Sequence, residues 1–328
     1  MTIRYAHLRR YGTRKKLDEV ETVEPRGGQL VGARGKLWDL RTGEAQKGFV
    51  KGFYASVDGR ACEYDEGEIV AVHPDGRRVR LAFPKPPQAL QSRGVFWVGP
   101  YLVARDQHDE PWIVVNTDTG AAVGRVQGQR KDSSGVFNPS VFDAHDNESL
   151  VFCDDASIQR LRARDATLTE LVAAPQGTCF VGCAAGRSGT FLIIERSLEA
   201  RAAFDTSKDA LVLRSAKGAE LRRFVGAKPP FQVNRLGEQF LVTDKEGFIL
   251  LDDELKELAR VALVDDDSFA RTIPLPSGRE WLAIGGYSEW DHYGDASLAP
   301  SNGKGLEPVK SAPAKKPAKD SAKKSSKR

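Results

Sequence analysis

Short apolar runs alternate with polar turns along most of the chain. Runs of four to seven apolar residues are separated by Gly, Pro, Asp and Asn. The period of about 3.6 residues that marks an amphipathic helix is nearly absent. This pattern is typical of short β-strands joined by tight turns, so we expect an all-β protein.

A hairpin pattern recurs six times: an apolar strand, a polar turn that often contains Gly, and a second strand. The turns fall near residues 43, 76, 120, 166, 218 and 255, which are 33 to 52 residues apart. Two units, over residues 95–126 and 231–263, show four strands in sequence. A period of about 35–50 residues with four strands per unit predicts the blades of a β-propeller. A blade buries both faces only against neighbouring blades, so the units should stack around one axis.

The number of blades depends on strands at the two ends of the chain. A seventh set is expected at residues 270–273 and 281–284, without third and fourth strands of its own. Residues 3–8 alternate in the manner of a strand and can pair with the C-terminal strands. Such pairing removes exposed edges from the ring. We therefore predict a single propeller over residues 1–290, closed by its N- and C-terminal strands, with seven blades or alternatively six.

Two motifs resemble known propeller families. Residues Leu37-Trp38-Asp39-Leu40, followed by Thr42-Gly43, are similar to the strand-and-turn core of WD40 repeats. The turn at 116–120, Asn-Thr-Asp-Thr-Gly, resembles turns of WD40 and quinoprotein-type propellers. Only one Trp-Asp dipeptide stands at the expected place and no Gly-His dipeptide opens a blade, so the histidine-centred network of WD40 blades is not expected. The resemblance implies the fold alone, which many unrelated functions share.

Charge divides the chain unevenly. The 328 residues carry a net charge of +4, yet residues 304–328 hold nine Lys or Arg and two Asp or Glu, while residues 1–303 have a net charge of −3. The Lys/Ala/Pro/Ser composition of this tail resembles that of linker histones and predicts disorder. Such a tail can bind DNA or another polyanion by counterion release. An acidic protein, a membrane surface and a role in solubility alone are the alternatives. The candidate polyanion-binding residues are Lys310, Lys315, Lys316, Lys319, Lys323, Lys324, Lys327 and Arg328.

Residues 291–303 are expected to form an exit segment between the propeller and the tail. The aromatic stretch at 287–293 overlaps its start, just past the last predicted strand. Aromatic side chains are favoured anchors of protein interfaces. The candidate partner-binding residues are therefore Tyr287, Trp290, His292 and Tyr293. The alternative is that these aromatics fold back and cover the closing blade.

The sequence offers little catalytic or metal-binding chemistry. It contains no P-loop, nucleophile elbow, zinc-protease motif or Rossmann fingerprint. The acidic runs at 154–155, 252–254 and 265–267 lack the alternation of a calcium loop, and we interpret them as solvated turns. Cys179 and Cys183 lie on one face of a predicted strand and should be buried. His145, between two carboxylates, is interpreted as a locally bonded turn residue.

These observations favour a non-catalytic propeller that presents a protein-binding surface, with the basic tail as an electrostatic tether. We expect no cofactor, no metal and a monomeric propeller, and no apolar run is long enough for a membrane span. Four cysteines in a chain of this length do not form a disulfide framework, which favours a reducing, cytoplasmic setting. Two alternatives remain open at this stage. One is a nucleic-acid-associated protein delivered by the tail, and the other is an enzyme or small-ligand sensor that uses the central channel.

Overall fold

The structure is a computed structural model of the whole chain. It describes residues 3–11, 24–26, 29–31, 36–39, 45–49, 60–65, 68–83, 95–104, 112–126, 141–142, 148–264 without 154, 188 and 230, 269–285 without 276, and 290–298. Statements below that something is absent or counted refer to these residues.

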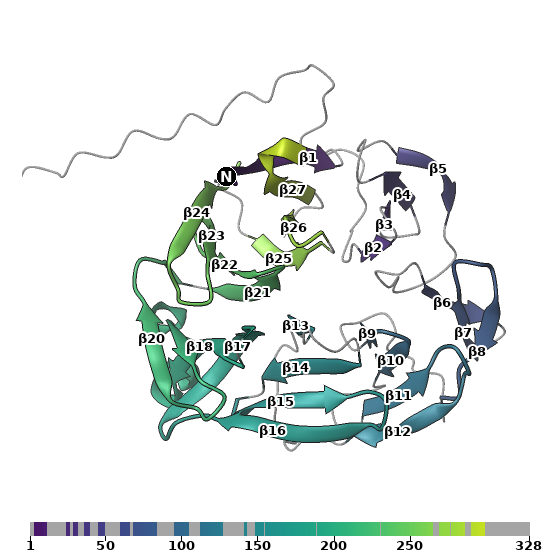
Figure 1. The fold of residues 1–328 in the computed structure, drawn as a ribbon, viewed down its shortest axis with the longest axis horizontal. Coiled ribbons are helices and arrows are strands. Elements are labelled where there is room, and N and C mark those ends of the chain that lie inside the picture. The colour runs from purple at the N-terminus through teal and green to yellow at the C-terminus, as the bar shows by residue number, and fades with distance from the viewer. Residues whose placement is uncertain are drawn as a thin grey trace, which may run out of the picture.

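The described strands form antiparallel sheets that stand side by side in a ring (Figure 1). Six sheets have four strands and one has three. The first three contain β2 (Glu24–Arg26), β3 (Gln29–Val31), β4 (Lys36–Asp39) and β5 (Ala45–Phe49); β6 (Ala61–Asp65), β7 (Glu68–Val72) and β8 (Arg78–Arg80); β9 (Val95–Val98), β10 (Tyr101–Ala104), β11 (Trp112–Asn116) and β12 (Ala122–Val126). The expectation of an all-β protein is confirmed.

The next three sheets continue the same order along the chain. They contain β13 (Val141–Phe142), β14 (Ser149–Cys153), β15 (Ser157–Arg162) and β16 (Thr167–Ala173); β17 (Thr178–Ala185), β18 (Phe191–Ser197), β19 (Ala210–Arg214) and β20 (Glu220–Phe224); β21 (Gln232–Leu236), β22 (Gln239–Thr243), β23 (Gly247–Leu251) and β24 (Glu257–Ala262). The last sheet is built from β25 (Phe269–Pro274), β26 (Glu280–Gly285), β27 (Trp290–Asp295) and β1 (Tyr5–Tyr11).

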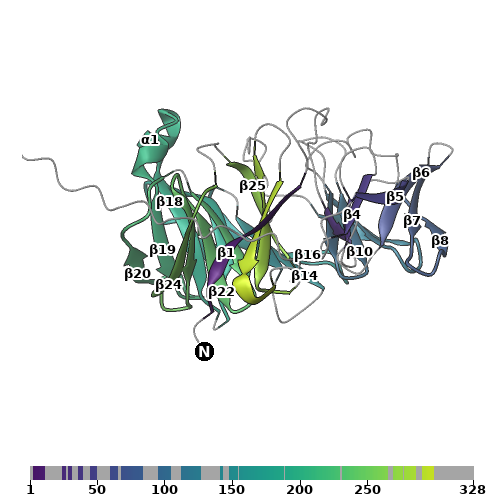
Figure 2. The same ribbon diagram turned by 90° about the horizontal axis from the view of Figure 1, so that it is seen from above.

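Three short helical pieces accompany the strands. The helix α1 (Leu198–Ala202) and the 3₁₀ helix η2 (Thr206–Lys208) lie between β18 and β19, and the 3₁₀ helix η3 (Ala296–Leu298) follows β27. Because successive strands are antiparallel, the connections fall on two opposite faces of the ring. We call one the α1 face; among the described residues, it carries those that link second to third strands and sheet to sheet, including residues 198–209 and 225–229. The other, which carries η3 and the remaining turns, is the opposite face (Figure 2).

The predicted turn positions coincide with residues in left-handed backbone conformation. Gly76, Gly120 and Gly218 have φ values of +85°, +77° and +83°. Ala166 and Leu255 occupy the same region at +53° and +61°. The sixth predicted turn, near residue 43, lies outside the described residues. The rhythm of the sequence therefore identified the hairpins correctly.

The core lies between neighbouring sheets rather than inside one layer. All five residues of β23 are buried, whereas four of the five in β20 are exposed. Inner strands are covered on both faces by adjacent sheets, but the outermost strand faces water. One cluster packs Leu213 of β19 against Ile249 and Leu251 of the following sheet. Cys179 and Cys183 are both buried, as predicted.

The end of the sheet region differs from the expectation. Residues 290–295 form β27, the third strand of the last sheet, instead of beginning an exit segment. β1 pairs antiparallel with β27, so that Tyr5 lies opposite Asp295 and Tyr11 opposite Trp290. The last sheet therefore has its own third strand, and the boundary drawn at residue 290 moves to at least Asp295. The boundary moves because β27 forms strand pairs with both β26 and β1, so its residues belong to the sheet.

Candidate functional site

The four residues predicted to bind a partner divide into two groups. Tyr287 lies outside the described residues, and only the backbone of Trp290 is described. His292 and Tyr293 are both buried. A partner cannot reach buried side chains, so the prediction of partner binding is wrong for these two. Both side chains pack within the closing sheet instead, which is the alternative stated above.

Tyr293 is part of an aromatic cluster between the last two sheets. Its ring stacks on Trp281 with centroids 5.8 Å apart and planes 8° from parallel. Phe248 from the preceding sheet lies 4.7 Å from Tyr293, centroid to centroid. The backbone N–H of Val264 donates to the Tyr293 hydroxyl at 3.3 Å. Tyr293 thus links the last sheet to its neighbour by packing and by one hydrogen bond.

Asp291 ties the N-terminal strand to the same sheet. His7 Nε2 donates to its carboxylate at 2.9 Å, and two nitrogens of Arg10 donate at 2.9 Å each. Burial alone would raise the pKa of Asp291, but the hydrogen bonds from His7 and Arg10 outweigh it and the pKa is lowered. In a similar pair, a carboxylate oxygen of Glu280 lies 3.0 Å from Nε2 of His292, and this close contact lowers the pKa of Glu280.

We expect acid to destabilise the protein through Asp291. A carboxyl group whose pKa is lower in the folded state contributes stability above its unfolded pKa, and this contribution is lost as the pH falls through the folded pKa. The loss should therefore occur below about pH 4, the ordinary pKa of Asp. Urea unfolding of the wild type and of Asp291→Asn between neutral and acid pH measures it. The variant should be less stable at neutral pH and less sensitive to acid, and an unchanged pH dependence would contradict this assignment.

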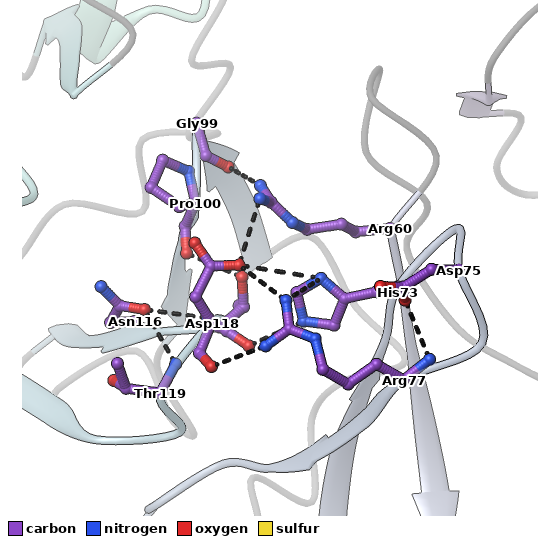
Figure 3. A network of polar contacts seen from close by, with 10 residues as sticks. Arg60, His73, Asp75, Arg77, Gly99, Pro100, Asn116, Asp118 and Thr119 are labelled. Atoms are coloured by element: carbon purple, nitrogen blue, oxygen red, sulfur yellow. Dashed lines mark hydrogen bonds and ion pairs between the residues drawn. The ribbon is translucent and has the colours of Figure 1, made fainter.

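A second polar cluster joins the β6–β8 sheet to the β9–β12 sheet on the opposite face (Figure 3). The carboxylate of Asp118 lies 3.3 Å from a guanidinium nitrogen of Arg60, 3.5 Å from one of Arg77 and 3.7 Å from Nδ1 of His73. Arg60 also donates to the carbonyl of Gly99 at 3.2 Å, and Arg77 to the carbonyl of Asp118 at 3.0 Å. The contacts cross the boundary between two sheets.

His73 is buried within this cluster, and both of its ring nitrogens are engaged. Nε2 lies 3.0 Å from the backbone oxygen of Thr117, which can only accept, so Nε2 carries the proton. Nδ1 accepts from Arg77 at 3.2 Å. Asp118 forms ion pairs with two arginines, and His73 forms hydrogen bonds with Thr117 and Arg77. This arrangement is suited to joining the sheets. It does not place His73 as a general base toward a bound molecule.

The turn that carries Asp118 is fixed by its first and last residues. Oδ1 of Asn116 accepts from the backbone N–H of Asp118 at 2.9 Å and of Thr119 at 3.1 Å. A Cβ on Gly120 would lie 2.1 Å from the carbonyl oxygen of Arg80 in the neighbouring sheet. The Asn-Thr-Asp-Thr-Gly sequence therefore serves a close approach between sheets. The sequence revealed the turn but not its partners, which are far away along the chain.

Comparison with known proteins addresses the fold. Neither a protein-family model nor a curated protein sequence matches the chain. The C-terminal WD40 domain of Sif2 is 13% identical with a TM-score of 0.54, and the match covers 90% of this chain and 99% of that one. A streptogramin B lyase is 11% identical with a TM-score of 0.51, covering 84% and 96%. BamB from Moraxella catarrhalis is 14% identical with a TM-score of 0.44, covering 83% and 84%.

The WD40 domain of Sif2 and the lyase, which match with TM-scores above 0.5, are β-propellers. The chain is a β-propeller. At such low identity the likeness concerns the fold alone, and each sheet of the ring can now be called a blade. The Asp118 cluster is therefore a contact between two adjacent blades, and the Asp291 cluster lies within the blade that contains both β1 and β27.

The other candidates from the sequence contribute less to a site. The basic tail residues, His145 and residues 265–267 lie outside the described residues. Asp252 accepts from the backbone N–H of Glu254 at 2.9 Å and of Lys256 at 2.8 Å, which is the geometry of a turn, as predicted. Within the described ranges, no group of three His, Cys, Asp or Glu residues could hold a metal ion, and no helix could span a membrane.

One feature of the propeller was not predicted from the sequence, the insertion at residues 198–209 that contains α1 and η2. It stands above the ring on the α1 face (Figure 2). Large apolar side chains are exposed in this insertion and in two blade-to-blade links of the same face: Leu198, Phe204, Val225 and Val264. The signal was present as a helix-prone Leu-Glu-Ala-Arg-Ala stretch between two strands. Its five residues are too few to give a helical period.

Proposed function

We propose that this protein is a non-catalytic propeller scaffold that presents a protein-binding surface on its α1 face. The observation that carries the proposal is the exposure of the four large apolar side chains named above on connections of that face. Connections that only join strands are normally polar. Apolar side chains at the centre of an interface are what a protein partner buries. The polar clusters, in contrast, are engaged with groups of the propeller itself.

The proposal includes a ring of seven blades closed by β1. The support is the pairing of β1 with β27 and the number of sheets among the described residues. Closure through a strand from the other end of the chain protects the edge of β27 and makes the ring a rigid support. A rigid support suits a scaffold because little order has to be gained on binding.

The proposed role of the basic tail is that of an electrostatic tether to a polyanion. It can be tested with duplex DNA as the probe, using the full chain and a chain shortened to residues 1–303. With roughly six to eight phosphate contacts, affinity should fall by about a thousandfold or more between 50 and 200 mM salt. A full-length variant with Gln at the eight candidate tail residues should bind as weakly as the shortened chain. Equal DNA binding by all three proteins would exclude the tail.

The scaffold itself is tested by affinity capture with the full chain and the shortened chain. Both should retain the same protein partner if the propeller surface binds it. A partner that is captured only through nucleic acid, and is lost after nuclease treatment, would favour the nucleic-acid alternative. If neither chain retains a partner, the scaffold proposal fails and the central-channel enzyme becomes the leading alternative.

A further inference from the structure

Phe204 is the most exposed large apolar residue among the described residues, at 88%. It directly follows α1 and its C-cap Ala203 in the insertion on the α1 face. A phenyl ring with this exposure is almost entirely in water and gains little from the propeller core. Its presence therefore requires an explanation other than packing.

The backbone at Phe204 makes this choice of residue less favourable still. Its φ is +54°, the left-handed region. The N–H of Asp205 donates to the carbonyl of Ala200 at 2.8 Å, and the N–H of Phe204 to that of Arg201 at 3.0 Å. These two bonds define the helix-ending motif whose left-handed position is usually occupied by Gly, because a Cβ is disfavoured there. Neither backbone preference nor burial accounts for Phe204.

The insertion that carries Phe204 is held firmly onto the propeller. Arg201 forms an ion pair with Asp155 of the neighbouring blade at 2.5 Å. Arg196 binds Asp209 through two hydrogen bonds, of 2.6 and 2.9 Å, across the base of the insertion. An aromatic ring on a fixed support loses little conformational freedom when a partner covers it, which favours binding.

The charges around Phe204 indicate the kind of surface that it fits. Glu199 is exposed, and Asp205 is the next residue after Phe204. Hydrogen bonds from Ser207 hold the pKa of Asp205 below its usual value, so the carboxylate is ionised at neutral pH. Arg196 and Lys208 both attract the Asp205 carboxylate, but Arg196 is engaged with Asp209, and Arg201 with Asp155. Residues 198–209 contain three carboxylates and two basic side chains, a net charge of −1. An anionic lipid surface would be repelled, whereas a basic protein rim would be attracted.

We propose that Phe204 is the anchor of the protein-binding surface and inserts into an apolar pocket with a basic rim on a folded partner protein. Leu198, which is also exposed, lies in the same insertion and would border the contact. This inference rests on the proposed scaffold function and assigns it a site.

The test uses Phe204→Gly in the full chain, beside Leu298→Ser as a matched control. Leu298 is an exposed apolar residue of η3, which lies on the opposite face. A photoreactive phenylalanine analogue at position 204 or 298 first captures the partner, which is then purified for titration. Phe204→Gly should melt no lower than the wild type, because Gly suits the left-handed position. It should bind the partner at least about tenfold more weakly, as loss of an interface anchor does. Leu298→Ser should bind normally, and Glu199→Lys should weaken binding by several-fold.

The outcomes separate this inference from the scaffold proposal. Equal affinity of Phe204→Gly and the wild type would overturn the anchor but leave the scaffold intact. A clearly lower melting temperature for Phe204→Gly would overturn it too, since Phe204 would then serve the fold. Two other results would also overturn it. If binding to vesicles of phosphatidylcholine and phosphatidylserine depends on Phe204, the residue contacts a membrane. If dimerisation in sedimentation depends on Phe204, the residue contacts a second copy of this chain. If neither photoreactive chain captures a protein but affinity capture with the wild type does, the anchor fails and the scaffold stands. If affinity capture with the wild type also retains no protein, the scaffold and the anchor fail together.

Discussion

Deletion of residues 1–11 is expected to lower the melting temperature by about 10 °C or more. These residues contain β1, whose removal exposes the edge of β27 and the buried contacts of Leu8. It also leaves the Asp291 carboxylate without His7 and Arg10. Loss of the packing of one buried Leu costs about 2–5 kcal/mol. At roughly 2 °C per kcal/mol for a domain of this size, that loss alone accounts for most of the shift.

Thermal unfolding followed by circular dichroism measures this effect, with the chain shortened to residues 1–303 as the control. The control should melt like the full chain, because it keeps every described contact. The deletion of residues 1–11 should also make the protein more prone to associate, since an unpaired strand edge is open to other chains. An unchanged melting temperature would mean that the ring is stabilised without β1.

Local signals were sufficient to predict the strands and turns of two complete blades. The four strands expected at 95–126 and at 231–263 correspond to β9–β12 and β21–β24 within a few residues. Their turns contain Gly or another residue in left-handed conformation, and their strands contain apolar runs buried on both faces. Both properties depend on residues close together in sequence, which is why a pattern along the chain reveals them.

Contacts between distant segments could not be predicted in the same way. Asp118 contacts Arg60, which is 58 residues earlier, and Asp291 contacts His7, which is 284 residues earlier. An isolated charged residue carries no local information about a partner so far away. The segment 290–295 was misplaced for the same reason. Its sequence, Trp-Asp-His-Tyr-Gly-Asp, lacks the apolar alternation of a strand because ion pairs with β1 and β26 replace apolar pairs.

The α1 insertion illustrates a different limit. A Phe after a short helix looks like a core residue in the sequence, because Phe is usually buried. Only the backbone conformation and the exposure of Phe204 show that it is neither a core residue nor a favourable helix end. Conflicts between local preference and observed conformation are expected at functional positions.

Tyr293→Ala should cost about 3–5 kcal/mol of stability, as truncation of a buried aromatic residue does. The substitution removes the ring that stacks on Trp281 and contacts Phe248, and it leaves the N–H of Val264 without the Tyr293 hydroxyl. A loss of this size is a large part of the 5–15 kcal/mol by which most domains are stable. Urea unfolding of the full chain measures it.

Two further variants separate packing from recognition at this position. Tyr293→Phe keeps the ring and should lose only about 1–2 kcal/mol, the cost of the missing hydrogen bond. Phe204→Ala removes an aromatic ring that is exposed instead of buried, so it should change stability by less than about 0.5 kcal/mol while weakening partner binding. The opposite result is that Tyr293→Ala unfolds like the wild type but no longer binds the partner. It would show that Tyr293 belongs to the binding surface, and it would contradict the placement of that surface at α1.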